Sequence, residues 1–193
     1  MIGYRRKNIL SLLDERTKLY GETVALGAKN AMGWQEFTYK GIGLLSRRLA
    51  CYLIDNLQVQ KGERLSILSE SKPEYGACVF ASAMAGMETV PLDIKLTKYE
   101  LINILSDCEP RVMLVSLACL PKALELQKEL PFIKDIIVMD EPPVGSPYTS
   151  LYNIPENYEA KWRPRSSKAT AFIIYTSGTT GNPKGVEISF GNI

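Results

Sequence analysis

A ten-residue stretch near the C-terminus, Thr176–Gly185, carries the residue types best suited to chemistry. It holds three glycines, four hydroxyl side chains and one lysine, and it lies between two apolar runs at 171–175 and 186–188. Glycines permit positive φ and let backbone N–H groups converge without interference from a Cβ atom. Converging amides form a concave anion-binding site, to which Lys184 would add a full positive charge. The stretch therefore predicts a site for a polyphosphate.

An ordinary turn is the alternative interpretation of these ten residues, because Gly, Thr, Asn and Pro are common in turns. A connection between two strands needs only about two to five residues, however, and this one is about twice as long. The stretch is not a Walker A sequence, since Lys184 has no preceding Gly and no following Ser or Thr. It is expected to lead into a strand, so little help from a helix dipole is predicted.

The twelve consecutive residues 175–186, Tyr-Thr-Ser-Gly-Thr-Thr-Gly-Asn-Pro-Lys-Gly-Val, resemble the phosphate-binding signature of the adenylate-forming superfamily. That superfamily includes acyl-CoA synthetases, peptide-synthetase adenylation domains and firefly luciferase. The resemblance implies that Lys184 neutralises the β- and γ-phosphates of ATP and that Ser177 offers its hydroxyl to Mg²⁺. The residues implied to bind the phosphates are Thr176, Ser177, Gly178, Thr179, Thr180, Gly181 and Lys184.

The resemblance implies a reaction that joins a carboxylate to ATP, giving an acyl-adenylate and pyrophosphate, and then passes the acyl group to a thiol. Coenzyme A is the favoured thiol, which makes a long-chain fatty acid–CoA ligase type the leading hypothesis. A peptide-synthetase or acyl-carrier-protein adenylation domain is the first alternative. A non-catalytic nucleotide-binding or interaction module is the second. The expected partners are a small-molecule carboxylate and the remaining C-terminal part of the same enzyme.

No catalytic residue is expected within residues 1–193, because blocks found later in the family are absent from them. These blocks are the acid that binds magnesium, the ribose-binding aspartate, the hinge and the lysine of the C-terminal domain. The chain is therefore expected to be an N-terminal portion that is inactive alone. Relatives often continue with Ser-His-x-Asn after the loop, whereas this chain has Phe190 in place of the histidine. Phe190 cannot titrate, so any role of that histidine is in doubt here.

Two upstream segments extend the resemblance. Residues 85–93 resemble a second block of the superfamily, a glycine followed by Val-Pro-Leu-Asp, and Asp93 at its end is not expected in the active site. Residues 38–42 resemble a first block, in which Gly41 replaces a glutamate that would complete a capping box. That departure is expected to affect stability and not chemistry.

The composition is that of an ordinary globular protein, with 46% hydrophobic residues, 23% charged residues and a net charge of +2. This balance gives no reason to expect nucleic acid as a partner. No secretory signal is recognised and the longest apolar run is too short to span a bilayer, so a cytoplasmic protein is expected. Membrane association through the basic residues 5–7 stays open as an alternative. The chain has no histidine, and its four cysteines are expected to be small buried hydrophobes.

A β–α repeat predicts an α/β fold, in which a parallel β-sheet is flanked by helices as part of a large N-terminal adenylation domain. Residues 1–60 are expected to form a helix, short strands and a second helix; 61–140 β/α units; 141–170 a Pro-rich surface connection; and 171–193 strand, phosphate loop and strand. Helices are expected to begin at Asn8, Thr38, Pro73, Thr97 and Pro121. Strands are expected at 24–26, 35–38, 64–68, 89–92, 112–115, 136–139, 171–175 and 186–188. Arg47, Arg48, Arg163 and Arg165 are expected to be solvated, and Trp162 to be packed.

Overall fold

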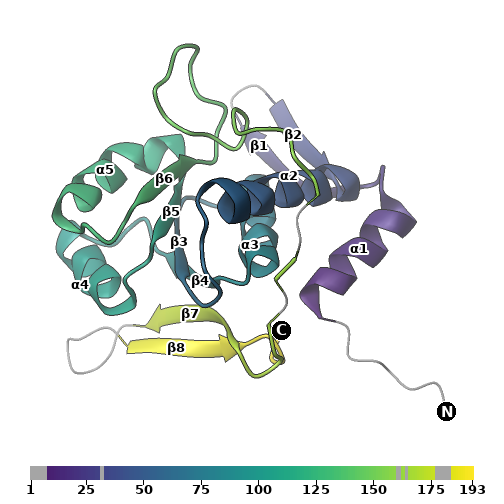
Figure 1. Cartoon of the computed structure of the whole chain (residues 1–193). Helices are drawn as coiled ribbons and strands as arrows, with labels where there is room; N and C mark the ends of the chain where they lie inside the picture. Colours follow the sequence, from purple (N-terminus) through teal and green to yellow (C-terminus); the bar gives the residue numbers. More distant parts are fainter. Residues whose placement is uncertain (1–7, 31–32, 160–161, 164, 177–183) are drawn as a thin grey trace.

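The computed structural model describes residues 8–30, 33–159, 162–163, 165–176 and 184–193. At its centre is a six-stranded sheet in the order β6-β5-β3-β4-β7-β8 (Figure 1). Neighbouring strands are parallel except β8, which runs antiparallel to β7. The strands are β3 (Arg64–Leu68), β4 (Glu88–Leu92), β5 (Val112–Val115), β6 (Asp135–Val138), β7 (Thr170–Thr176) and β8 (Lys184–Ser189). The predicted α/β class with a mostly parallel sheet is confirmed.

Helices cover both faces of this sheet (Figure 1). They are α1 (Ile9–Tyr20), α2 (Tyr39–Cys51), α3 (Pro73–Ala85), α4 (Lys98–Cys108) and α5 (Leu120–Glu129). Side chains alternate along each strand, so Leu65 and Ile67 of β3 pack in the core with α2 and α3, whereas Leu68 packs with α4 and α5. Every β3 side chain from Leu65 to Leu68 is buried, which explains the continuous apolar strands in the sequence.

A separate antiparallel hairpin of β1 (Val24–Asn30) and β2 (Gly33–Thr38) precedes α2. Thr38 ends this hairpin and also caps α2, because its Oγ1 accepts a hydrogen bond from the backbone N–H of Gly41 at 3.1 Å. The glycine that replaces the family's glutamate therefore still supplies the capped amide. A short π-helical turn, Tyr52–Asn56, continues α2 to the predicted end of the helix.

Three of the five predicted helix starts, at Asn8, Thr38 and Thr97, are confirmed by side-chain caps, whereas α3 begins at the predicted Pro73 without one and α5 begins at Leu120, one residue before the predicted Pro121. Asn8 Oδ1 accepts from the Ser11 amide at 2.8 Å at the start of α1. At α4, Thr97 and Glu100 form the predicted capping box, with the two reciprocal bonds at 2.8 and 3.3 Å. Gly86 ends α3 with φ +74°, and a Cβ atom there would meet the Arg163 carbonyl oxygen at 2.8 Å. These local signals fix where the β/α units begin and end.

The prediction that Arg47 and Arg48 are solvated is wrong. Arg47 forms an ion pair with Asp14 at 2.5 Å, and its guanidinium carbon lies 5.1 Å from the centroid of the Trp162 ring. Arg48 Nε donates to the carbonyl oxygen of Ile154 at 3.0 Å. Arg47 thus joins α2 to α1 and to Trp162, and Arg48 joins α2 to Ile154 in the Pro-rich connection.

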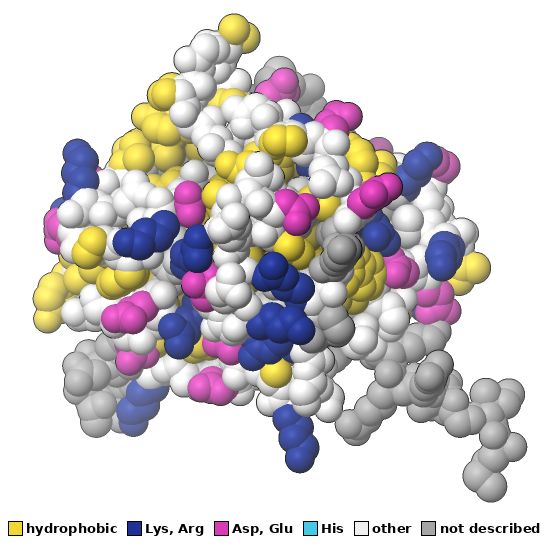
Figure 2. Space-filling model, in the orientation of Figure 1, with side chains coloured by type: hydrophobic (Ala, Val, Ile, Leu, Met, Phe, Trp, Pro, Cys, Tyr) yellow, Lys and Arg dark blue, Asp and Glu magenta, His cyan; other side chains and the backbone are white. Residues whose placement is uncertain are grey.

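The prediction that Arg163 and Arg165 are solvated is also wrong, whereas the prediction of a packed Trp162 is confirmed. Arg163 donates to the carbonyl oxygen of Val59. Arg165 pairs with Glu88 at 3.1 Å, and the two side chains are only 17% and 14% exposed. Figure 2 shows positive side chains lying beside negative ones over much of one face, in keeping with the small net charge.

The Pro-rich connection 141–170 is not confined to the surface as predicted. Its Leu151 and Ile154 are buried in the core beside α2 and α3. The Leu151 amide donates to the carbonyl oxygen of Val138 at 2.9 Å, and Ser150 forms a β-bridge with Val138. The connection therefore returns to the sheet at the end of β6 before it leads to β7.

The cysteine prediction holds for Cys51, Cys78 and Cys108, which are buried, but Cys119 is only half-buried. Burial is the main cause that raises the pKa of the Cys108 thiol to about 12. In the part of the chain that the structure describes, no helix has the length and apolar character needed to cross a membrane.

Candidate functional site

The candidate site lies at the end of the β7–β8 ladder, where Thr176 and Lys184 are directly paired. The two predicted strands are present, but both extend into the stretch predicted as the connection, so that Thr176, Lys184 and Gly185 lie in strands. The predictions for five residues fall outside the described part of the chain. These are Ser177, Gly178, Thr179, Thr180 and Gly181. Their assignment to phosphates, and that of Ser177 to Mg²⁺, stays a prediction.

The direction of β7 places this site at the carboxyl edge of the sheet. β7 is parallel to β4, with Thr89 opposite Phe172, and β4 is parallel to β3. The chain therefore leaves β7 at the same edge where it leaves the other parallel strands. Open α/β sheets bind their ligands beyond the carboxyl ends of the strands. The location is thus suited to a nucleotide.

Thr176 and Lys184 lie on the exposed face of the ladder. Side chains alternate along a strand, and residues directly opposite each other share a face. Thr176 and Lys184 therefore share a face with the next pair, Ile174 and Val186, and all four residues are exposed. The hydroxyl and the ammonium group emerge side by side at the end of an apolar strip.

Tyr175 lies on the opposite face of β7, where it packs with Ile173 against the core formed by α4 and α5. Its hydroxyl donates a hydrogen bond to Asp107 Oδ2 in the last turn of α4. Burial, followed by this hydrogen bond, raises the pKa of the Tyr175 phenol above its usual value. Sequence analysis missed this contact, because nothing local connects two residues 68 positions apart.

Gly185 serves a different purpose from the one predicted. It lies in β8 and does not adopt the positive φ that was expected of it. A Cβ atom at Gly185 would instead come within 2.8 Å of Ile173 Cγ2 and 3.1 Å of Tyr175 Cζ. Glycine is required because these two side chains occupy that space. The pairing of Tyr175 with Gly185 across the ladder was the missed signal.

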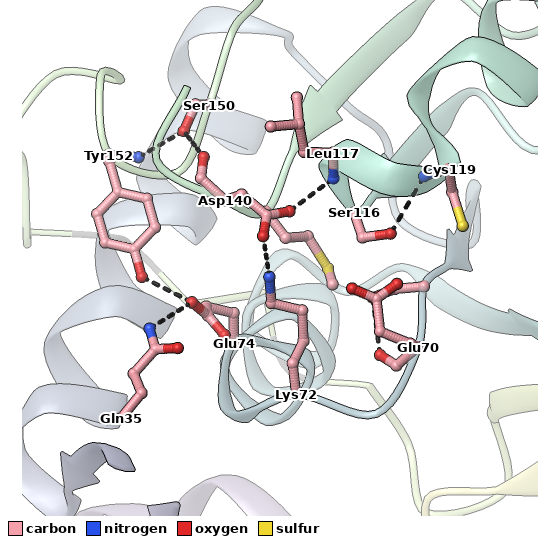
Figure 3. Close-up of polar contacts among 12 residues, drawn as sticks. Gln35, Glu70, Lys72, Glu74, Ser116, Leu117, Cys119, Asp140, Ser150 and Tyr152 are labelled. Carbon is pink, nitrogen blue, oxygen red and sulfur yellow. Dashed lines mark hydrogen bonds and ion pairs between the residues drawn. The ribbon is translucent and has the colours of Figure 1, made fainter. Parts of the chain in front are cut away.

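A polar cluster closes the carboxyl ends of β3, β5 and β6 (Figure 3). Lys72, which precedes α3, forms an ion pair with Asp140, just beyond β6. The other carboxylate oxygen of Asp140 accepts from the Leu117 amide at 2.6 Å, and its carbonyl oxygen accepts from the Ser150 hydroxyl at 2.6 Å. Asp140 therefore joins the ends of three strands and the Pro-rich connection at the carboxyl edge of the sheet, on the side of β4 opposite to β7.

Glu74 forms a second buried junction in the same view (Figure 3). The residue is 2% exposed in the first turn of α3. Its Oε1 accepts from Gln35 Nε2 at 3.1 Å and from the Tyr152 hydroxyl at 2.8 Å. Among the described residues, its Oε2 has no hydrogen-bond partner. Burial, followed by the charge of Glu74, raises the pKa of Tyr152.

The segment after β8 carries no titratable group at the position where relatives often have histidine. Phe190 packs against the core of α2 and α3, and its amide donates to the Ala169 carbonyl oxygen at 3.0 Å.

The described residues contain no group of three or more acidic or thiol side chains that could hold a metal ion. Asp93 accepts from the Lys95 amide at 2.9 Å, a local turn contact in keeping with its predicted minor role.

Comparisons with known proteins show the family and the fold of the chain. Residues 13–193 match the AMP-binding enzyme family. The human long-chain-fatty-acid–CoA ligase ACSBG1 is 31% identical over 185 residues, covering 90% of this chain and 25% of that protein. The 2-succinylbenzoate–CoA ligase of Bacillus velezensis is 28% identical, covering 93% of this chain and 33% of that protein. The chain thus spans about a quarter to a third of these relatives.

Solved structures share the fold. The anthranilate CoA ligase AuaEII in complex with anthranoyl-AMP superposes with a TM-score of 0.84 at 24% identity, covering 95% of this chain and 35% of that one. The inhibitor-bound N-terminal domain of FACL13 from Mycobacterium tuberculosis gives 0.78 at 26% identity, covering 95% and 44%. Since the family match covers most of the sequence, the chain belongs to the AMP-binding enzyme family.

Proposed function

We propose that this chain supplies the polyphosphate-binding part of an ATP-dependent, carboxylate-activating ligase. The observation that carries the proposal is the pairing of Thr176 with Lys184 on the exposed face of the ladder, at the carboxyl edge of the sheet. An ammonium group and a hydroxyl at this edge fit the oxygens of a polyphosphate. The residues proposed to hold the β- and γ-phosphates of ATP are Thr176, Ser177, Gly178, Thr179, Thr180, Gly181 and Lys184.

The chemistry asked of these residues is electrostatic. When a carboxylate attacks the α-phosphorus of ATP, negative charge grows on the departing pyrophosphate. Lys184 would neutralise that charge, and preorganised donors aimed at developing charge are usually the largest single contribution to such catalysis. ATP supplies the adenylyl group that is transferred to the carboxylate, and Mg²⁺, with Ser177 as the proposed contact, would share in the neutralisation. The thiol that accepts the acyl group is proposed to be coenzyme A.

A fatty acid–CoA ligase is the favoured type, because relatives named as long-chain-fatty-acid–CoA ligases recur among the matches. Adenylation domains form the first alternative, since the adenylation domain of a carboxylate reductase superposes with a TM-score of 0.82. Its identity of 19% supports the shared fold alone. A nucleotide-binding module without catalysis is the second alternative, for which Phe190 in place of histidine is the specific observation.

Calorimetric titration of the 193-residue chain with ATP and with pyrophosphate, each with Mg²⁺, tests the proposal. Binding of both ligands at one site per chain is expected. Carboxylate-dependent exchange of labelled pyrophosphate into ATP, measured with this chain joined to the C-terminal part that is proposed to complete the enzyme, then separates the hypotheses. Exchange supports a ligase, binding without exchange supports a nucleotide-binding module, and the absence of binding contradicts both.

A further inference from the structure

Tyr175 connects three elements at the base of the proposed phosphate site. It belongs to β7, it is paired with Gly185 in β8, and its hydroxyl donates to Asp107 in α4. Its ring also occupies the space above Gly185, where a Cβ atom would approach Cζ to 3.1 Å and Cε1 to 3.3 Å. One side chain therefore contacts α4 and the beginning of β8 at the same time.

The two residues that Tyr175 constrains are the immediate neighbours of the proposed ligands. Tyr175 directly precedes Thr176, and Gly185 directly follows Lys184. Consecutive Cα atoms are about 3.8 Å apart across a planar peptide, so fixing Tyr175 and Gly185 leaves Thr176 and Lys184 little freedom of position. The side chains of the two pairs point to opposite faces of the ladder. Tyr175 can therefore fix the backbone of the site without touching the ligand.

We infer that Tyr175 is a positioning residue for phosphate binding, held by Asp107 and packed over Gly185. This inference rests on the proposed function, because it assumes that Lys184 contacts the phosphates. Its physical basis is preorganisation: a site whose backbone is already fixed loses less conformational entropy when the ligand binds. A hydroxyl that donates to a carboxylate makes a stronger bond than one between neutral groups, which suits Tyr175 and Asp107 to this role.

Titration with pyrophosphate and Mg²⁺ tests the inference in the 193-residue chain. Tyr175→Phe removes the hydroxyl and keeps the ring over Gly185, and a loss of affinity of about threefold to tenfold is expected. Asp107→Ala should show a similar loss, whereas Asp107→Asn retains an acceptor oxygen without the charge and should lose less affinity than Asp107→Ala. Tyr99→Phe is the matched control, because Tyr99 also belongs to α4 but is 73% exposed.

A double-mutant cycle separates positioning from general stability. If Tyr175 acts by fixing the position of Lys184, Tyr175→Phe should cost little further affinity for pyrophosphate in a chain that already carries Lys184→Ala. Equal losses in both backgrounds would contradict the inference. An unchanged affinity in Tyr175→Phe, with Lys184→Ala impaired, would overturn the inference and leave the proposed function standing. An unchanged affinity in Lys184→Ala would overturn both.

Discussion

Arg48 and Ile154 are joined by a hydrogen bond that spans 106 positions of the sequence. Arg48 Nε donates to the Ile154 carbonyl oxygen at 3.0 Å, and Arg48 Nη2 donates to the same oxygen. Nη2 also donates to the Tyr152 carbonyl oxygen, at 3.4 Å. One guanidinium thus satisfies backbone acceptors in a segment that has no regular secondary structure. Arg48 is therefore a principal anchor of the Pro-rich connection on α2.

Arg48→Ala should destabilise the chain and release this connection. The substitution leaves the carbonyl oxygen of the buried Ile154 without its charged donor, a loss of about 1–3 kcal/mol in the free energy of unfolding. Chemical denaturation measures that loss, and limited proteolysis should cut within 141–159 sooner than in wild type. Lys18→Ala, at an exposed position on α1, serves as the control. Identical stability and cleavage in the two variants would show that Arg48 does not anchor the connection.

Tyr152→Phe should also reduce stability, through the buried carboxylate of Glu74. Glu74 Oε1 would keep only its contact with Gln35, while the carboxylate stays buried. Losing a donor to a buried charged group is expected to cost about 1.5–3 kcal/mol, measured by denaturant unfolding. Tyr148→Phe, on the exposed part of the same connection, should change stability by less than about 0.5 kcal/mol. Equal effects of the two substitutions would contradict the assigned role of Glu74.

The four thiols should react in a defined order with iodoacetamide. Cys119 is half-buried, whereas Cys51, Cys78 and Cys108 are buried. Burial also raises the pKa of Cys108 to about 12, so at pH 8 its reactive thiolate is scarce. Mass spectrometry of the native chain should find Cys119 modified first, and all four thiols modified only in denaturant. Labelling of Cys78 or Cys108 in the native chain as fast as Cys119 would show that the reagent reaches these thiols and that they are not buried.

Much of the fold could be predicted from the sequence, because its signals are local. Asn8, Thr38 and the Thr97–Glu100 pair act within three residues of themselves, and their caps are where the pattern places them. Mainly apolar runs such as 65–68 and Val112–Val115 indicate strands covered on both faces, and both segments lie in parallel strands. Structure that depends on interactions between residues close in the sequence can be predicted from the sequence.

The contacts that sequence analysis missed all join distant positions. Arg47 is paired with Asp14 from an earlier helix, and Arg165 with Glu88 from β4. A charged residue beside a turn or on the polar side of a helix looks the same in sequence whether it is solvated or paired. The half-buried Cys119 was missed for a similar reason, since apolar neighbours in sequence do not ensure burial by neighbours in space.

The two strands on either side of 177–183 could be predicted from the sequence, whereas the contacts that hold these strands in place could not. The signature residues on both sides of 177–183 occupy adjoining strands, with Thr176 opposite Lys184, as a phosphate-binding connection requires. The steric reason for Gly185 and the bond between Tyr175 and Asp107 depend on cross-strand register and on the position of α4. Neither contact could be predicted without knowledge of the strand order and of the position of α4.

The titration of pyrophosphate into wild type and Lys184→Ala tests the central claim most directly. Lys168→Ala is the matched control, because Lys168 is equally exposed but lies before the opposite end of β7. Loss of the neutralising charge is expected to weaken binding by about 1.5–3 kcal/mol, or more than tenfold, while the control binds like wild type. Equal affinity of wild type and Lys184→Ala would contradict the assignment of this site to the phosphates of ATP.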